Sequence, residues 1–449
     1  MAYKVSVIIP IYNSERYLRQ TIDSVVCQRG FEFEKDIQLI LINNATEDNS
    51  EQICLEYVNH YPKNVTYLKL ESNNGPSRAR NVGLSCASAD TINFLDSDDC
   101  WEENALFKAY ETLKNNSAIV DLVVCRVKNF ESENGWDLYD WRFKKGSRVI
   151  DISEESDARQ CKITPCLIKS EVAKEVIFDE EVRHAEDMKY VTDIILKKGK
   201  FYLLKEAVFL YRVRDNGSSL WQSIKKSRNW YFETVNNVLE YLIEISIKKY
   251  GYVIRYIQFL IYGDLHDRIP LKEIDILTQD EFDEYKSKLE KCFGIVDDSI
   301  IVEDTRLPLE MKVYEILFKY ECNPRAISVL VNLVNNGLLK EKIRYLFPYE
   351  MVSPGDDIYL YGGGDLGRQY LDEIARGNYC NVMGVIDKDI KKCIVVHEHL
   401  FYLNEFNFSG IEKIIISIVD AKIAEDVKQD LIKRGVKESN IIWKIHQLN

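Results

Sequence analysis

The sequence predicts an α/β protein in which a helical region separates two α/β domains, and three observations carry that prediction. Short β-branched runs alternate with amphipathic segments over residues 4–100. Long helical periods replace this pattern from about Trp221 to Tyr349, and strand–helix alternation resumes after Pro354. A chain of 449 residues also exceeds what one hydrophobic core usually serves. We therefore expect three domains, over residues 1–220, 221–351 and 352–449.

The N-terminal strands are expected to form a parallel sheet. Four β-branched runs are separated by segments of helical period, which is typical of βαβ units. Between the first two runs, Leu18, Ile22 and Val25 repeat at helical spacing, and Ser14 is suited to cap that helix. The expected strands span residues 5–11, 37–42, 65–70 and 91–95. Ligands of open α/β sheets bind beyond the carboxyl ends of such strands, so the loops there are the expected functional region.

The middle region and the C-terminal domain show different periodicities. Apolar residues such as Trp230 and Val238 repeat at helical spacing, and Thr278 with Glu281 forms a capping box before a further helix. In the last domain we expect a helix near residues 369–375 and strands at residues 358–361, 382–386 and 414–418. This pattern predicts a second, compact α/β domain.

Composition and charge exclude several classes of protein. The net charge of -13 argues against wholesale nucleic-acid binding, because a phosphate backbone is held by clustered Lys and Arg. The 11 cysteines contain no C-x-x-C pair, so neither a zinc ribbon nor a redox motif is expected. The apolar stretches are too short to span a bilayer, and the first 12 residues lack the features of a secretory signal. We expect a cytoplasmic protein. The basic residues that accompany the aromatic helices of the middle region are expected to form a solvated face, and peripheral contact with the inner face of the membrane is the alternative.

An apolar strand ends abruptly in the carboxylates Asp96, Asp98 and Asp99. Like charges so close together need a counter-cation, and this position suits a metal ion on a diphosphate. Asp96 and Asp98 are therefore candidate ligands of Mn²⁺ or Mg²⁺. Taken alone, Asp-x-Asp is a weak signal, and an acidic turn that merely ends a strand is an equal alternative.

Four ordered motifs favour the metal site over a simple acidic turn. They are Val7-Ile8-Ile9-Pro10-Ile11-Tyr12-Asn13, Asn43-Asn44-Ala45-Thr46-Glu47-Asp48, Asn74-Gly75-Pro76-Ser77-Arg78-Ala79-Arg80-Asn81 and Leu95-Asp96-Ser97-Asp98-Asp99. In order and spacing they resemble family-two glycosyltransferases of the GT-A fold, over roughly residues 4 to 220. The resemblance implies a nucleotide-diphospho-sugar transferase sheet in which Asp96 and Asp98 hold the metal. It also implies that the nucleotide-sugar lies against Pro10, Tyr12, Asn44, Arg80 and Asp96.

One motif departs from the family pattern. The family usually has Asp before Gly-Ser in the second motif, where it accepts from the uracil ring, whereas this chain has Asn44-Ala45. An amide both donates and accepts hydrogen bonds, so Asn44 suits uracil, cytosine or another base. UDP is the favoured nucleotide.

Two acids open a predicted helix at Glu186 and Asp187. The ordinary explanation is that first-turn acids complement the helix dipole. The resemblance instead assigns the pair to catalysis, with Asp187 as the base that deprotonates the acceptor hydroxyl and Glu186 beside it. Inverting transfer needs one such base and no enzyme nucleophile.

A further family-like segment is Tyr211-Arg212-Val213-Arg214-Asp215-Asn216-Gly217-Ser218-Ser219. Arginine suits a developing diphosphate charge, so Arg212, Arg214 and Ser218 are candidate donor ligands. The alternative is a polar surface loop. The sequence does not decide which arginine makes the contact.

A glycine-rich turn lies in the C-terminal domain. Gly362, Gly364 and Gly367 stand between a strand and a helix, and Asp387 follows about 20 residues later, which satisfies the dinucleotide fingerprint. The stretch also resembles small Rossmann-like modules attached to bacterial polysaccharide-assembly enzymes, where bound cofactors are not general. NAD binding is therefore an alternative and not the expectation.

Together these features predict a metal-dependent, inverting glycosyltransferase that moves a sugar from a nucleotide-diphosphate donor onto a glycan or lipid-linked glycan acceptor. Surface polysaccharide or capsule assembly as the setting rests on the resemblance, and a homo-oligomer is an expected state. Three alternatives stay open: a bifunctional transferase with an NAD-dependent C-terminal domain, a nucleotidyltransferase, and a non-catalytic sugar-nucleotide-binding scaffold. The Asp-x-Asp and Glu-Asp pairs together argue against the scaffold.

Overall fold

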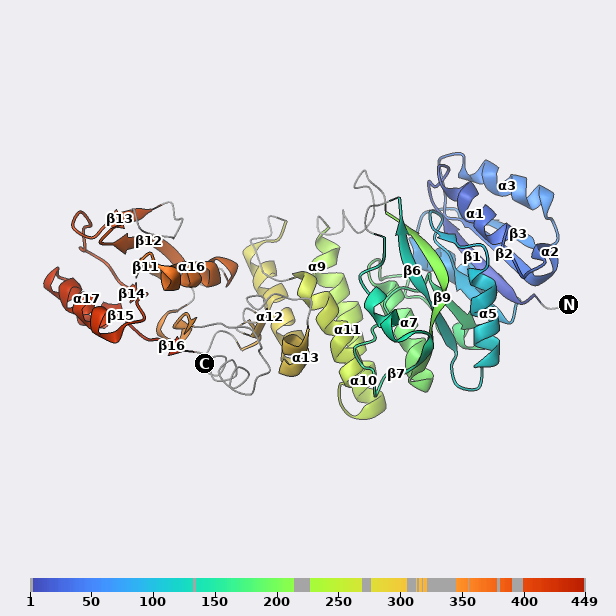
Figure 1. Cartoon of the computed structure of the whole chain (residues 1–449). Helices are drawn as coiled ribbons and strands as arrows, with labels where there is room; N and C mark the ends of the chain where they lie inside the picture. Colours follow the sequence, from blue (N-terminus) through green and yellow to red (C-terminus); the bar gives the residue numbers. More distant parts are fainter. Residues whose placement is uncertain are drawn as a thin grey trace. The chain divides into compact units, whose positions relative to one another are not determined.

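The structure is a computed structural model that describes residues 3–131, 135–213, 227–268, 276–304, 312, 315–316, 318–320, 345–353, 355–377, 380–389 and 399–447. It divides into two compact units, Met1–Ile261 and Tyr262–Asn449 (Figure 1). The division falls within the region expected to be helical. The domain boundaries near residues 220 and 351 stay a prediction.

A nine-stranded sheet forms the framework of the first unit, with the order β3-β2-β1-β4-β8-β6-β9-β5 and β7 paired to β9. Its first four strands are parallel to their neighbours among these four and lie within one residue of the expected bounds: β1 Val5–Ile11, β2 Ile37–Asn43, β3 Val65–Lys69 and β4 Thr91–Phe94. The other strands are β5 Cys100–Trp101, β6 Leu122–Phe130, β7 Arg148–Asp151, β8 Cys166–Lys169 and β9 Lys200–Arg212.

The first four strands form the expected parallel arrangement, and the sheet as a whole is mixed. β8 lies between β4 and β6 and is antiparallel to both, while β5 and β7 are antiparallel to β9. β6 and β9 are parallel to each other. The parallel half therefore ends at β4, and the antiparallel β8 joins it to the second half.

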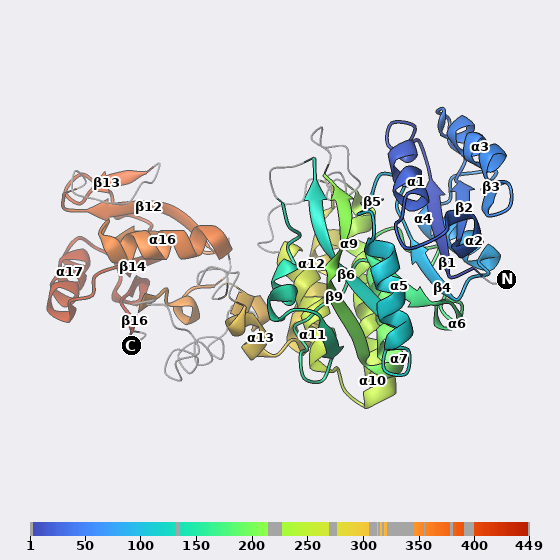
Figure 2. The same ribbon diagram turned by 45° about the vertical axis from the view of Figure 1, so that its right-hand side comes forward.

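Helices cover both faces of this sheet, and the central strands β1 and β2 are therefore buried on both sides. One face packs against α1 Leu18–Val26, α3 Ser50–His60 and α5 Ala105–Asn115, the last of which lies in front of the strands in Figure 2. The short helices are α2 Phe33–Asp36, the 3-10 helix Asp140–Lys145 and α6 Ser170–Ala173.

The opposite face packs against α4 Pro76–Cys86, and α7 Glu186–Lys198 lies against β9. A Cβ atom on Gly83 of α4 would lie 2.3 Å from Cγ2 of Ile8, so this glycine permits the close approach of α4 to β1.

Ser14 does not cap the first helix, which corrects an expectation. The helix begins at Leu18 and has no side-chain cap, whereas the Ser14 hydroxyl donates to the Tyr12 carbonyl and also bonds with the Ser97 hydroxyl. Ser14 thus joins the loop after β1 to the loop after β4.

The expected helical region begins in the first unit with α9 Arg228–Thr234, a π-helical turn Val235–Leu239 and α10 Glu240–Tyr250. The division between the units falls within the next helix, α11 Arg255–Leu265. In the second unit, α12 Gln279–Ile295 begins with the expected capping box of Thr278 and Glu281, and α13 Asp298–Glu303 follows. No helix in the described part of the chain is long and apolar enough to cross a bilayer.

The second unit contains a parallel five-stranded sheet with the order β13-β12-β11-β14-β15. Its helices are α16 Asp365–Gly377 and α17 Ala421–Lys433. Its strands are β11 Asp357–Tyr361, β12 Asn381–Asp387, β13 Leu400–Tyr402, β14 Ile414–Ile416 and β15 Ile441–Ile442, and β10 Tyr345–Leu346 pairs separately with β16 His446–Gln447. This arrangement is compatible with the expected Rossmann-like domain.

Backbone conformation and packing explain two of the three fingerprint glycines, Gly362, Gly364 and Gly367. Gly362 has φ of +112°, and a Cβ atom on Gly367 would lie 2.1 Å from the Gly362 carbonyl oxygen. A Cβ atom on Gly364 would meet nothing within 4 Å. Asp387 accepts a hydrogen bond from the Gly363 N–H over 2.8 Å.

Candidate active site

The loops after β1, β2 and β4 lie at one edge of the sheet, because these strands are parallel neighbours. Pro10 lies near the end of β1, and Tyr12 follows that strand with 45% of its surface exposed. Asn44 follows β2 and is buried. Asp96 and Asp98 follow β4. The structure therefore brings these five predicted residues to the same side of the unit.

Asn44 is held in one orientation by its neighbours. Its side-chain amide donates to Oδ1 of Asn73 over 2.7 Å and to the Gly75 carbonyl over 3.2 Å. Because both partners are acceptors, the NH₂ group must face them. The buried Oδ1 atom of Asn44 is left without a hydrogen-bond partner among the described residues.

The turn after β4 concentrates negative charge. Asp99 is buried, and its carboxylate accepts a hydrogen bond from the Arg212 backbone N–H over 2.8 Å. Burial, together with the charges of Asp98 and Asp96, raises the pKa of Asp99 well above its usual range. This excess of negative charge fits a site for a divalent cation.

Arg212, the last residue of β9, braces that turn. Its Nε–H donates to the Asp98 carbonyl over 2.7 Å, and its Nη2 donates to Gln20 over 2.7 Å. It also pairs with Glu131 and lies between the rings of Tyr17 and Phe130, 4.4 and 4.3 Å from their centroids. The Arg212 guanidinium is thus committed to protein groups. Arg214 and Ser218, the other two residues predicted in this segment, lie outside the described residues.

Arg80, on α4, connects the turn after β4 with the acid pair that opens α7. Its Nη2 atom lies 2.9 Å from Oδ1 of Asp96, and its Nη1 atom lies 2.9 Å from both Oε1 of Glu186 and Oδ1 of Asp187. Only 3% of the Arg80 side chain is exposed. Burial opposes its charge, but the three carboxylates outweigh burial and raise the pKa of Arg80, so it stays protonated.

The two acids of α7 share one electrostatic environment and are largely but not fully buried, with 12% of the Glu186 side chain and 22% of the Asp187 side chain exposed. Burial and the charge of Asp187 raise the pKa of Glu186 to about 7, against the opposing effect of Arg80. Burial also raises the pKa of Asp187, and Arg80 opposes this shift too. The second oxygen of Asp187 accepts a hydrogen bond from the Ile163 N–H over 3.2 Å.

Several residues of this constellation could not be found by motif. Ile163 acts through its backbone, which leaves no signal in a side-chain pattern. Gln20 and Asn73 are amides whose roles depend on the chain around them. Phe178, whose ring lies 5.3 Å from the Arg80 guanidinium, looks in sequence like an ordinary apolar residue.

The loops of the site also contain unusual backbone. Among the described residues, the non-glycine positions with positive φ are Asn13, Ala45, Glu131 and Ala185, with φ between 48° and 63°. Asn13 follows Tyr12, Ala45 follows Asn44, Glu131 pairs with Arg212, and Ala185 precedes Glu186. Each therefore adjoins or contacts a predicted site residue.

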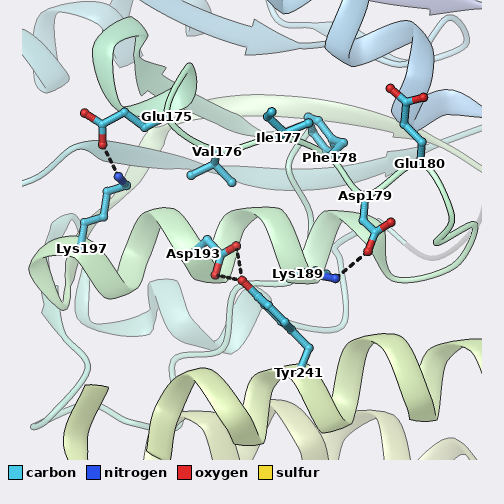
Figure 3. Close-up of a pocket in the computed structure, with 10 residues that line it drawn as sticks. All are labelled: Glu175, Val176, Ile177, Phe178, Asp179, Glu180, Lys189, Asp193, Lys197 and Tyr241. Atoms are coloured by element: carbon cyan, nitrogen blue, oxygen red, sulfur yellow. Dashed lines mark hydrogen bonds and ion pairs between the residues drawn. The ribbon is translucent and has the colours of Figure 1, made fainter. Parts of the chain in front are cut away.

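A pocket of about 680 Å³ lies beside α7 and α10 and shares Phe178 with this constellation (Figure 3). Its polar groups pair with one another. Lys189 contacts Asp179, and the Tyr241 hydroxyl donates to the carboxylate of Asp193. Neither the Asp-x-Asp nor the Glu-Asp carboxylates line it.

The protein groups alone do not complete a metal site. Within the described ranges, no three His, Cys, Asp or Glu side chains gather closely enough to hold a metal ion. The oxygen donors Asp96 and Asp98 fit Mn²⁺ or Mg²⁺ only with further ligands, such as the phosphates of a nucleotide.

The chain is similar to several known proteins. Residues 6–175 match the family described as Glycosyl transferase family 2. The minor teichoic acid biosynthesis proteins GgaB and GgaA of Bacillus subtilis are 34% and 37% identical, over 67% and 57% of this chain. The chain spans only 33% and 57% of their respective lengths. Poly(ribitol-phosphate) beta-N-acetylglucosaminyltransferase TarP of Staphylococcus aureus is 30% identical, over 55% of this chain and 74% of TarP.

A solved structure shares the fold. It is S. aureus TarS, residues 1–349, in complex with UDP-GlcNAc, and it has a TM-score of 0.53 at 17% sequence identity. The likeness covers 76% of this chain and 94% of that one. It confirms the expected GT-A type of architecture.

Proposed function

The chain belongs to glycosyl transferase family 2, and on that premise we propose that it is an inverting, metal-dependent glycosyltransferase that moves a sugar from a UDP-sugar onto a glycan hydroxyl. One observation carries the proposal. The carboxylate of Asp96 and those of Glu186 and Asp187, about 90 positions apart in sequence, contact the same buried guanidinium. A donor-binding acid and a candidate base therefore lie within one small site.

The surroundings of Asn44 support a base that offers an N–H donor, and uracil is one such base. Its NH₂ group already serves Asn73 and Gly75, so the group left for a ligand is the acceptor Oδ1. Uracil carries an N–H donor on its pairing edge and would satisfy that oxygen. An unsatisfied buried acceptor is costly, which favours a ligand with a donor at this point.

Asp96 and Asp98 would hold the divalent cation together with the diphosphate. The bound cation supplies charge stabilisation for the departing nucleotide. Arg212 keeps the Asp98 carbonyl and the Asp99 carboxylate in place within the same turn. Because Arg212 is committed to these groups, Arg214 and Ser218 are the proposed donor contacts of that segment.

Asp187 is the proposed base. Both of its oxygens have fixed partners, Arg80 and the Ile163 N–H, so its carboxylate has a defined orientation. It would take the proton from the acceptor hydroxyl as that oxygen attacks the sugar on the face opposite the diphosphate. This single displacement inverts the anomeric configuration.

The acceptor and the cellular setting are proposed from the relatives. GgaA and GgaB bear names that place them in minor teichoic acid biosynthesis. We assign this chain to surface-polymer assembly at the inner face of the membrane, with a glycan or lipid-linked glycan as acceptor. Residues after about 350 would contribute placement or assembly.

The test is a hydrolysis and thermal-shift screen of the purified chain across nucleotide sugars, with Mn²⁺, Mg²⁺ or excess EDTA. We expect UDP-sugars to stabilise the protein and to be hydrolysed only when a divalent ion is present. Asp98→Ala should nearly abolish turnover. Asp90→Ala, at the opposite end of β4 and exposed, is the matched control and should retain it. Full activity in EDTA would overturn the metal dependence, and pyrophosphate release from a nucleoside triphosphate would indicate a nucleotidyltransferase instead.

A further inference from the structure

The Arg80 guanidinium lies among the carboxylates of the site. It is enclosed by three carboxylates from two separate segments, the turn after β4 and the start of α7. The Nε atom is also buried and has no partner among the described residues. The side chain therefore faces the acids of the site and is almost wholly removed from solvent.

We propose that Arg80 is a positioning residue for the base, which fixes the Asp187 carboxylate relative to Asp96. The proposal rests on the proposed function, and it differs from the family-based expectation that Arg80 lines the nucleotide pocket. Arg80 acts here through Asp187 and not on the substrate.

The planar guanidinium matches the geometry of these contacts. One Nη nitrogen serves both acids of α7 while the other serves Asp96, and each N–O distance is 2.9 Å. The rigid fork of arginine holds several acceptors at set angles, which a lysine ammonium cannot do. Arg80 thus sets the distance between the acid expected to bind the metal and the acid expected to act as base.

Aromatic packing beneath Arg80 fixes the same distance. The ring of Phe178, which lies 5.3 Å from the guanidinium, stacks on Tyr190 of α7 with centroids 3.8 Å apart. Phe94 of β4 contacts both rings edge-on, at 5.1 and 5.7 Å. The two elements that carry the acids are therefore tied together by a buried aromatic cluster, and Arg80 lies beside Phe178, one of its members.

Two hydrogen bonds from described residues hold the Asp187 carboxylate. Arg80 donates to Oδ1, and the Ile163 N–H donates to Oδ2. The loss of Arg80 would leave one hydrogen bond to orient the carboxylate. Since a misplacement of about 1 Å in a reacting group can cost about 100-fold in rate, the expected effect is on turnover.

A double-mutant cycle tests this assignment, with Arg80→Lys, Asp187→Asn and the combination in the full chain. Transfer at saturating donor is measured together with calorimetric binding of UDP in the presence of Mn²⁺. We expect Arg80→Lys to lower kcat by about 100-fold and to leave UDP affinity almost unchanged. In the Asp187→Asn background, Arg80→Lys should have little further effect, because residues that act as one unit are not additive.

Arg78→Lys is the matched control. Arg78 lies two residues away on α4, is half exposed and pairs with Glu180. Its replacement should leave kcat unchanged. If Arg80→Lys does not fold, Arg80→Gln, which removes the buried charge, enters the same cycle with the same expectations.

Two outcomes would overturn the proposal. Weakened UDP binding with normal kcat at saturation would make Arg80 a nucleotide ligand, and losses that multiply in the double variant would show that it acts independently of Asp187. If the wild-type chain transfers no sugar from any nucleotide donor, the proposed function itself fails. If the wild-type chain is active but the losses in the double variant multiply, only the positioning role of Arg80 fails.

Discussion

Arg212 and Asp98, 114 positions apart in the chain, are joined by a hydrogen bond of 2.7 Å from the Arg212 Nε–H to the Asp98 carbonyl. The Arg212 backbone N–H also donates to the neighbouring Asp99 carboxylate. The end of β9 thus determines the shape of the carboxylate turn. Substitutions of Arg212 should therefore affect metal binding first.

We predict that Arg212→Lys raises the Mn²⁺ concentration for half-maximal activity by about tenfold, because a lost hydrogen bond to a charged group costs roughly 1.5 kcal/mol or more. Activity as a function of Mn²⁺ concentration measures the effect. Arg126→Lys is the control, since Arg126 pairs with Asp140 away from the turn. An unchanged Mn²⁺ requirement in Arg212→Lys would refute the bracing role.

Asp187→Asn should slow transfer by about 100 to 10,000-fold while donor affinity changes little, because the amide keeps the volume but no longer accepts a proton. The measurement is the transfer rate beside calorimetric donor binding. Glu186→Gln is the comparison. Collapse in Glu186→Gln alone would move the role of base to Glu186.

The raised pKa of Glu186 predicts a pH-dependent stability. Between its usual pKa of 4.5 and the folded value of about 7, the folded chain keeps a proton that the unfolded chain has lost. Stability from this group is thus fully present below pH 4.5 and is lost as pH rises through 7. Glu186→Gln mimics the protonated form.

We therefore expect Glu186→Gln to gain stability over wild type between pH 5 and 8, by on the order of 2 kcal/mol at the upper end. Denaturant unfolding at several pH values measures the difference. A flat difference for Glu186→Gln would mean that its pKa is not raised.

The glycine-rich turn of the second unit predicts a contrast between two alanine substitutions. Gly367→Ala places a methyl group 2.1 Å from a backbone oxygen and should destabilise the turn by about 1–3 kcal/mol. Gly364→Ala meets open space and should be nearly neutral. Hydrogen exchange of peptides from β11 and α16 measures both effects locally, and equal protection in the two variants would contradict the packing argument.

Much of the first unit was predictable because the sequence patterns that indicate its strands and its acidic turn lie within short segments of the chain. The alternation of β-branched runs predicted β1 to β4, and the abrupt carboxylates after β4 predicted the acidic turn. The position of β8 was not predictable, because its antiparallel insertion between β4 and β6 depends on pairing partners far away in sequence. The cap expected at Ser14 failed for a similar reason, since a hydroxyl bond to Ser97 competes for its side chain.

The candidate site was predictable as a set of acids but not as an arrangement. Asp96 and Asp187 could be singled out by motif. Their common contact with Arg80 depends on how α4 and α7 pack on the sheet, and the hydrogen bond from Ile163 depends on backbone direction alone. Likewise, whether the Arg212 guanidinium contacts protein groups or the sugar donor depends on where β9 ends.

Four non-glycine residues with left-handed backbone adjoin or contact the predicted site residues, and each stores roughly 1–2 kcal/mol of strain. Selection for heat resistance would therefore favour glycine at Ala45 and Ala185, because replacing alanine by glycine relieves the backbone strain with the loss of a single methyl group. Those changes would also loosen the loops beside Asn44 and Glu186, the residues that we assign to the nucleotide and to the catalytic acid pair. Engineering for thermostability and engineering for turnover would compete for the same few positions in this protein, and a durable variant is better sought in the helices that cover the sheet.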